Sequence, residues 1–435
     1  MVMKIRILII LLLGAPLAHA QGPPLTCNAS AASTPMVRAD GFSELVADYV
    51  VTCTGGTPTG NGMNVPAGNI TVFVNTNATS QMLMAAGAPG DWSEALLLID
   101  EPAGTATTAG NLRYCTSTGC TMKGVGAAGG ANYLAGDAQN INPANLYQGR
   151  QSGPNQMIFL GVPIDPPGVG HTRTLRITNV RVNANALGYS LTVPSNVQMV
   201  VMATAFNINN NNQVVGSSLG GLLTGCEGST KSSGVSFREN FASSFKIGGN
   251  IASNVAGVSS GTENGFYNKT FAISGANNFV AGVDQLTTNI NNAGLAFAGT
   301  RLMVTFNEPS NGDIWIPSYV PLVNTANGSI SGYAVLASGT VTVPNPAPTT
   351  AAQSVLTKVT VAAGTGFAVY EVMQTSATLV EDLSIPFFDS LGNSLTYTGT
   401  ADIQLATSGG SGSASLTAAV PRFNAAPTKT WTMGP

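Results

Sequence analysis

Two serines of this chain lie in the pattern G-x-S-x-G, which in many hydrolases holds a nucleophilic serine on a tight turn between a strand and a helix. They are Ser218 (in GSSLG) and Ser259 (in GVSSG). The chemistry needs an acid and a histidine later in the chain, and that histidine accepts the serine proton. Both histidines, His19 and His171, come before the serines. Because the chain also holds 51 glycines, we interpret both segments as glycine–serine turns.

A second motif, GVGAAG at 124–129, fits the G-x-G-x-x-G pattern of dinucleotide-binding turns. That turn must follow a strand and open a helix, so that the helix N-terminus meets the pyrophosphate. This segment follows a cysteine-bounded loop and is too rich in glycine to start a helix well. We interpret it as a loop and expect no cofactor. His171 lies in a glycine-rich turn with no acid nearby in sequence, which is typical of a surface residue.

Carboxylates offer a third chemistry, because glycoside hydrolysis uses two carboxyl groups held roughly 5–10 Å apart. The candidate acids are Asp100, Glu101, Asp313, Glu381, Asp382 and Asp389. Acids of this kind are common at strand ends, so a carboxylate-dependent hydrolase is the least favoured function. The oxygen-rich segment 307–313 could hold calcium but lacks the spacing of a calcium loop. Without a C-x-x-C pair or clustered histidines, we predict no metal site.

Three aromatic residues, Trp92, Trp315 and Tyr319, are candidates for stacking on sugar rings, because a flat ring complements the apolar face of a sugar. Trp315 lies between Ile314 and Ile316 in a segment typical of a strand, so its side chain points away from theirs. Core packing is the commoner use of such a tryptophan, and sugar stacking is the alternative.

Residues 1–20 have the three parts of a cleavable secretion signal. Lys4 and Arg6 provide the positive segment, an apolar run covers 7–13, and alanines occupy the cleavage positions. No later segment is long and apolar enough for a transmembrane helix. We therefore expect a secreted protein at the cell surface, outside the cell or in the periplasm.

The charge of the chain is low and slightly acidic. Charged residues make up 9% of the sequence, and the net charge is −3 before loss of the signal, which removes two positive charges. Ordinary soluble domains have roughly 25% charged residues. With no basic stripe, nucleic acid is excluded as an expected partner. The surface must be covered mainly by uncharged polar residues, as on many exported β-proteins.

Export makes disulfides the default interpretation of the five cysteines. Several pairings are open. The simplest joins Cys115 to Cys120 in a small loop and ties Cys27 to Cys53 at the end of a predicted strand. Cys226 is then left over, as a buried thiol or the site of an intermolecular bond.

Most local patterns predict β-strands, and Asn-Gly pairs between them predict hairpins. The apolar run at 198–206 is typical of a central strand covered on both faces. Segments 237–245 and 285–293 are expected to form short helices. Further strands are predicted at 50–53, 70–75, 175–178, 302–306, 339–343, 368–373 and 395–397. The fold class predicted is all-β, with tandem antiparallel β-sandwich (immunoglobulin-like) domains.

Two composition changes predict the domain boundaries: a Gly/Ser-rich segment at 222–236 and a proline-rich segment at 343–350. We expect a disulfide-bearing β-sandwich at 21–230, a middle β domain at 231–345 and an immunoglobulin-like sandwich at 346–435.

Six segments resemble a family of exported β-rich (β-sandwich) bacterial proteins with no known activity. They are VRADGFSEL at 37–45, TCTGG at 52–56, SEALLLID at 93–100, YQGRQ at 147–151, FLGVPIDPPG at 159–168 and RITNVR at 176–181. The resemblance covers mainly residues 27–205. It implies export and a β architecture, and it assigns no catalytic residues.

We therefore expect a secreted or cell-surface protein that is not an enzyme, with a structural, adhesive or macromolecule-binding role. Surface polysaccharide or other surface proteins are its expected partners. An array of carbohydrate-binding modules is the alternative, and exposure of Trp92 or Trp315 on a flat face distinguishes it.

Overall fold

The fold is all-β, as the sequence predicts. The computed structural model describes residues 24–39, 41, 43–80, 82–85, 88–100, 115, 119–141, 143–227, 233–246, 300–307, 313–336, 355–359, 365–376, 378–396, 400–405 and 431–432. The predicted signal at 1–20 lies outside these residues. Within them there is no α-helix, and no helix is long and apolar enough to cross a membrane.

The strands before residue 220 and one short 3-10 helix build the first part of the molecule. They are β1 Thr26–Ala31, β2 Met36–Arg38, β3 Glu44–Leu45, β4 Tyr49–Gly55, β5 Ala67–Val74, β6 Met82–Ala85, β7 Ala88–Ile99, β8 Leu146–Gly153, β9 Gln156–Pro163, β10 Gly168–Thr178, β11 Arg181–Val182, η2 Ala184–Leu187, β12 Ser195–Ala203, β13 Ile208–Asn209 and β14 Asn212–Leu219.

The remaining strands build the second part. They are β15 Leu222–Glu227, β16 Gly234–Glu239, β17 Arg301–Asn307, β18 Ile314–Pro317, β19 Tyr319–Asn324, β20 Ile330–Leu336, β21 Leu356–Val359, β22 Thr365–Gln374, β23 Glu381–Pro386, β24 Thr400–Leu405 and β25 Trp431–Thr432.

The first sheet curls around its own core. Its strand order is β13-β1-β4-β10-β7-β8-β9-β5-β12-β14-β2, with β6 beside β7. β13 and β14 are two residues apart in the chain yet lie near opposite ends of this order, so the two ends of the sheet must meet. Pairing is antiparallel except for β1 with β13 and β2 with β14, which are parallel.

Alternation along the strands places the first core inside this curl. In β4, Tyr49, Val51 and Cys53 are buried, and the residues between them are more exposed. β12 alternates in the same way, because Met199 is buried and Met202 is 53% exposed. The segment 198–206 is therefore buried on one face only. The prediction that both of its faces are covered is wrong.

Both predicted disulfides are present. Cys27 is bonded to Cys53, and these residues lie directly opposite each other in β1 and β4. Cys115 is bonded to Cys120. Cys226 lies in β15 opposite Val235 of β16. Its side chain is not among those that the structure describes, so its role as a leftover thiol stays a prediction.

The second sheet joins strands from both sides of residue 345. Its order is β15-β16-β23-β19-β20-β22-β17-β24-β25. β16 pairs with β23, and β20 pairs with β22. The second core includes Phe237, Leu322 and Leu383 and so mixes the same segments. The predicted boundary at 345 therefore falls within one sheet and one core. Pairing between strands that are distant in the sequence determines which segments form one domain.

The first boundary also lies earlier than the sequence predicts. β14 ends at Leu219 in the first sheet, and β15 starts the second sheet at Leu222. The expected helix at 237–245 is replaced by β16, which runs to Glu239 and ends in turns. The helix expected at 285–293 lies outside the described residues.

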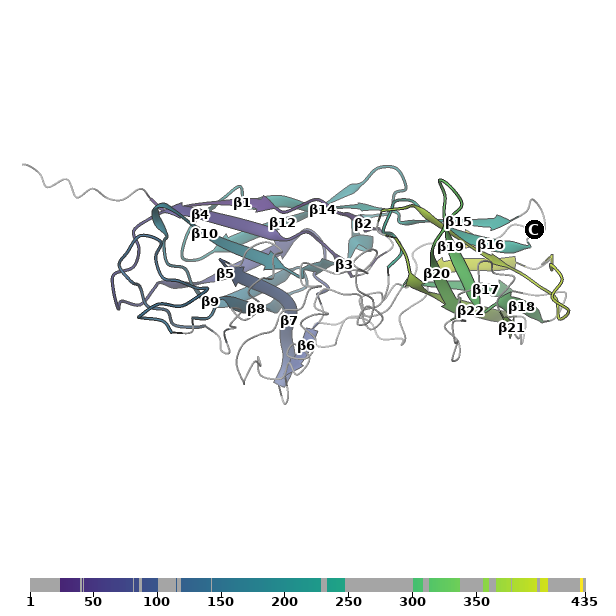
Figure 1. The fold of residues 1–435 in the computed structure, drawn as a ribbon, viewed down its shortest axis with the longest axis horizontal. Coiled ribbons are helices and arrows are strands. Elements are labelled where there is room, and N and C mark those ends of the chain that lie inside the picture. The colour runs from purple at the N-terminus through teal and green to yellow at the C-terminus, as the bar shows by residue number, and fades with distance from the viewer. Residues whose placement is uncertain are drawn as a thin grey trace, which may run out of the picture.

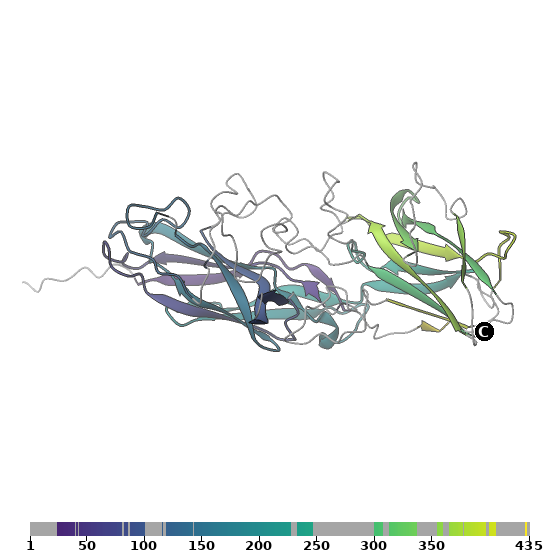
Figure 2. The ribbon, with the colours of Figure 1, turned by 90° about the horizontal axis from the view of Figure 1, so that it is seen from below.

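Figures 1 and 2 show the two cores side by side along the longest axis of the molecule. We call the contact between them the joint, made by Arg38, Tyr189, Leu191, Gly220, Gly221, Asn240 and Thr300. The Asn240 side chain donates to the backbone oxygens of Leu191 (3.0 Å) and Gly220 (2.9 Å). Across the joint, Arg38 Nη1 donates to Thr300 Oγ1 at 3.1 Å.

The connection at the joint is short and tightly packed. Arg38 is 1% exposed and forms an ion pair with buried Glu44. A Cβ atom on Gly221 would lie 2.3 Å from Arg38 Cγ, so the arginine fits only because this position is glycine. The two cores are thus held together by side chains packed over the connection Gly220–Gly221 as well as by the connection itself.

Candidate functional site

The three predicted sugar-stacking residues do not come together. Tyr319 lies in β19, is 2% exposed, and stacks on Tyr333 with ring centroids 5.3 Å apart. Trp92 lies in β7 of the first sheet, and its side chain lies outside the description. Trp315 is partly exposed in β18, between two isoleucines that are fully buried. Of these residues, Trp315 is the one whose described side chain reaches the surface.

A row of four residues crosses the sheet around Trp315, and we call it the aromatic row: Lys358, Trp315, Phe388 and Ser394. Trp315 lies opposite Lys358 of β21 on one side and opposite Phe388 on the other. Phe388 in turn lies opposite Ser394. Residues directly opposite each other in a sheet point to the same face, so all four side chains share one face. Figure 1 shows β18 and β21 together at the edge of the second part.

Backbone bonds fix this row. The Trp315 amide donates to the Phe388 oxygen at 2.9 Å, and the Phe388 amide donates back to the Trp315 oxygen at 2.8 Å. On the far side, the Leu395 amide donates to the Phe387 oxygen at 2.8 Å. Strands lie about 4.8 Å apart, so the row spans about 14 Å.

The opposite face of the same segments is packed into the second core. Five chain neighbours of the row are packed in or against that core: Ile314, Ile316, Val359, Phe387 and Leu395. Phe387 packs edge-on against Phe306 with ring centroids 5.2 Å apart. Neither Trp315 nor Phe388 belongs to that core. The alternation therefore directs the two rings of the row away from it.

Charged groups flank the row in a neutral pair. Lys358 Nζ lies 2.5 Å from Asp313 Oδ2, and both side chains are more than 40% exposed. Asp389 follows Phe388 and accepts hydrogen bonds from the Asn393 side chain and from the backbone amides of Leu391 and Asn393. These bonds, first that from the Asn393 side chain, lower the pKa of Asp389. They also fix the turn that carries Ser394 beside Phe388.

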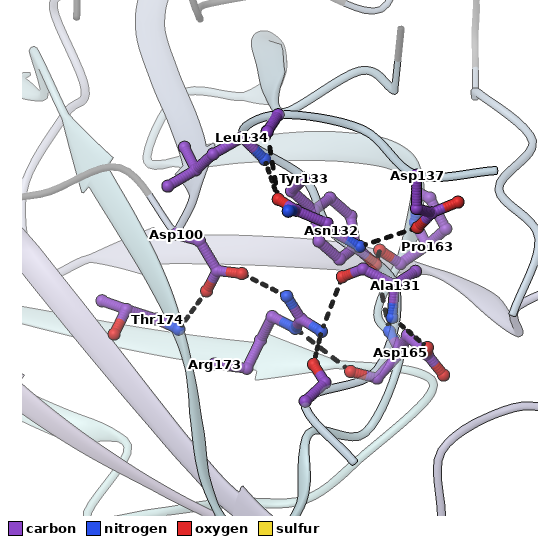
Figure 3. Close-up of polar contacts among 12 residues, drawn as sticks. Asp100, Ala131, Asn132, Tyr133, Leu134, Asp137, Pro163, Asp165, Arg173 and Thr174 are labelled. Carbon is purple, nitrogen blue, oxygen red and sulfur yellow. Dashed lines mark hydrogen bonds and ion pairs between the residues drawn. The ribbon is translucent and has the colours of Figure 1, made fainter. Parts of the chain in front are cut away.

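A buried polar cluster lies at the other end of the molecule, around Arg173 of β10 (Figure 3). Arg173 is 2% exposed and forms an ion pair with Asp100 at the end of β7. Its Nε donates to the Asp165 backbone oxygen at 3.1 Å, and its Nη2 donates to backbone oxygens of Gly129 (3.0 Å) and Ala131 (3.1 Å). Its guanidinium also lies 4.4 Å from the Tyr133 ring centroid.

The partners of Arg173 are satisfied as well. The Asp165 carboxylate accepts from the amides of Thr59 (2.8 Å) and Ala131 (2.7 Å). The Tyr133 hydroxyl donates to the Pro163 oxygen at 2.7 Å, and burial raises the pKa of that hydroxyl. These bonds attach the loop around Ala131 to the first sheet. We call this cluster the clasp. Its charged groups already have internal partners, so we interpret its role as structural.

Two other carboxyl groups meet in the second core. Glu239 of β16 and Glu381 of β23 are 1% and 0% exposed. Glu239 accepts from the amides of Phe245 (2.6 Å) and Glu381 (2.9 Å). Burial, and then the nearby charge of Glu381, raises the pKa of Glu239 to about 8. The sequence pairs Glu381 with Asp382, but Asp382 lies on the other side of β23 and forms an ion pair with Arg238.

The remaining motifs fall in structural positions. Ser218 is 2% exposed in β14, where its hydroxyl lies 3.5 Å from the Ala184 oxygen. The segment 124–129 is a loop, and His171 is exposed in β10. Ser259, Glu101 and residues 308–312 lie outside the described residues. Among those described, no three metal-ligating side chains of His, Cys, Asp or Glu form a group.

Sequence reasoning missed Phe388 and Ser394 because neither lies in a long alternating strand. Both are placed by isolated bridges around the Asp389 turn. The signal that was present is the turn segment DSLGN at 389–393, which predicts a hairpin that returns the chain beside Phe388.

No protein-family model and no curated protein matches the chain. Among solved structures, the C-terminal domain of the AgI/II polypeptide BspA of Streptococcus agalactiae is 7% identical, and the alignment covers 88% of this chain and 96% of that one with a TM-score of 0.25. The serine-rich repeat adhesion glycoprotein of Streptococcus agalactiae is also 7% identical, with 95% and 97% covered and a TM-score of 0.23. Scores of this size do not establish a common fold. The family resemblance of residues 27–205 stays a prediction.

Proposed function

We propose that this chain is an exported, non-catalytic protein of the cell surface or its surroundings, with an adhesive or structural role. The observation that carries the proposal is the joint, which packs two β cores end to end through Arg38, Asn240 and Thr300. Such an arrangement holds the outer surfaces of the two cores at a fixed distance from one another. The two disulfides and the secretion signal predicted at 1–20 support a location outside the cytoplasm.

The buried charges support the same proposal. Arg173 holds a loop, and Arg38 holds the joint. Three of the described acids that the sequence offers for hydrolysis form ion pairs: Asp100 with Arg173, Asp313 with Lys358 and Asp382 with Arg238. Asp389 accepts hydrogen bonds within its own turn, and Glu381 is buried and accepts from Thr375 and from the Ser376 amide. These pairings favour a scaffold over a carboxylate-dependent hydrolase.

The test is fractionation of the source cells followed by a binding assay. Beads coated with residues 21–435 should attach to intact cells of the source organism or to beads that carry the same protein. Beads coated with the heat-unfolded protein provide the control. Recovery of the protein in the cytoplasm, or equal attachment of both bead types, would refute the proposal.

Carbohydrate binding is the second candidate, and the partial exposure of Trp315 favours it. The tryptophan presents its ring on the outer face of β18, where a sugar can reach it. Quenching of tryptophan fluorescence by added polysaccharide tests this candidate, and unchanged emission across a panel counts against it.

A further inference from the structure

The aromatic row has the shape of an extended binding strip. Four side chains lie on one face across adjacent backbone segments, over about 14 Å. The two rings, Trp315 and Phe388, are neighbours in the middle, and Lys358 and Ser394 lie at the ends. Because the opposite face is packed in the second core, the position of each side chain is fixed by the sheet.

The row is apolar in the middle and carries hydrogen-bonding groups at both ends. The rings of Trp315 and Phe388 offer flat apolar surface, and the indole N–H can donate a hydrogen bond. Lys358 and Ser394 add donors, and the hydroxyl of Ser394 can also accept. A polymer that fits must therefore have repeated apolar faces with hydroxyl groups around their edges.

Charge selects among such polymers. The one cation of the row, Lys358, is already paired with Asp313 at 2.5 Å. A polyanion would meet that carboxylate and compete with it for the lysine, so the flank disfavours an anionic chain. The carboxylate of Asp389 beside Phe388 adds a further negative charge that would repel a polyanion. An uncharged chain meets no such repulsion and can bond to both partners of the ion pair.

We infer that the aromatic row binds an uncharged polysaccharide, with successive sugar rings stacked on Trp315 and Phe388. This inference deepens the proposed function by naming a site and a ligand class. A protein partner is the competing occupant, but protein hot spots centre on side chains that fill deep pockets. The row is a line of exposed and partly exposed side chains on one face of paired backbone segments.

The experiment measures binding of soluble cellohexaose, chitohexaose, maltohexaose and mannohexaose to residues 21–435 by calorimetry. At least one should bind the unchanged protein. Trp315→Ala and Phe388→Ala should each weaken that binding by about tenfold, which is the size of one stacking contact. Trp315→Phe should lose less, because a ring remains. Thermal unfolding of each variant shows that the fold is retained.

Phe367→Ala is the matched control. Phe367 is an aromatic residue of the second sheet that is 65% exposed and lies in β22, outside the row. Its replacement should leave oligosaccharide binding unchanged. A loss equal to that of Trp315→Ala would overturn the assignment to the row.

Three further outcomes test this inference and the proposed function separately. If none of the four oligosaccharides binds while coated beads still attach to cells, the row assignment fails and the adhesive proposal stands. If Trp315→Ala and Phe388→Ala bind as the unchanged protein does, a glycan site lies elsewhere and the inference is refuted. Binding that depends on the row, in a protein whose beads do not attach, supports the inference and refutes adhesion.

Discussion

Replacement of Glu239 by glutamine is expected to flatten the pH dependence of stability between about pH 5 and pH 8. Glu239 is 1% exposed, and burial is the largest cause that raises the pKa of its carboxyl from 4.5 to about 8. In this window the folded protein keeps a proton that the unfolded chain releases. Stability is therefore greatest below the unfolded pKa and falls as the pH rises toward the folded pKa.

The magnitude follows from the two pKa values. Each pH unit between them costs about 1.4 kcal/mol, so the full window costs roughly 5 kcal/mol. The glutamine variant does not titrate and avoids this loss. Its amide nitrogen cannot accept a hydrogen bond, so one of the amides of Phe245 and Glu381 loses its acceptor, at a cost of about 2 kcal/mol. Glu239→Gln should thus be less stable than the natural protein at pH 5 and more stable at pH 9.

Urea unfolding followed by circular dichroism from pH 5 to pH 9 provides the measurement. The matched control is Asp382→Asn on the neighbouring strand. Asp382 forms an ion pair with Arg238, which is 53% exposed, and pairs with an exposed partner contribute less than about 1 kcal/mol. Stability curves that run parallel for the natural protein and Glu239→Gln, without a crossing, would refute the reasoning.

Three other variants test the contacts that stabilise the fold. Arg173→Met leaves the clasp without its cation and should cost about 3 kcal/mol, measured by urea unfolding, with faster proteolysis near Ala131; unchanged proteolysis would contradict the clasp. Thr300→Val removes the acceptor of two hydrogen bonds, from Arg38 across the joint and from the Lys246 amide, and should lower stability by about 2 kcal/mol. It should also broaden the distribution of distances between the two cores in small-angle scattering; an unchanged distribution would show that the joint does not need the Arg38 bond. Cys27→Ser with Cys53→Ser should lower stability by about 3 kcal/mol, and a melting temperature equal to that of the natural protein would argue against a stabilising role of the bond.

The features that depend on near neighbours in the sequence were predictable. Alternation and turn residues predict the β class, and the pairings that spacing and strand position made the simplest of several are the ones present. Alternation alone predicts that the Trp315 side chain lies on the other face of the strand from those of Ile314 and Ile316. Which of the two faces was the core depended on Phe387 and Val359, which are distant in sequence.

The division of the chain could not be predicted in the same way. A proline-rich segment at 343–350 is typical of a linker, but β16 and β23 pair across it. Local composition carries no information on which distant strand completes a sheet.

The bond between Cys27 and Cys53 also has a mechanical consequence. A pull on the chain ahead of Thr26 would load β1 from its first residue and, without a cross-link, unzip it from β4 one hydrogen bond at a time. Cys27 is the second residue of β1, and its partner lies in β4, which is itself paired with β10 on the other side. Tension would pass through the covalent bond into the interior of the sheet, where many backbone bonds share it in shear. β1 would then withstand traction that would peel an unbridged strand away from β4.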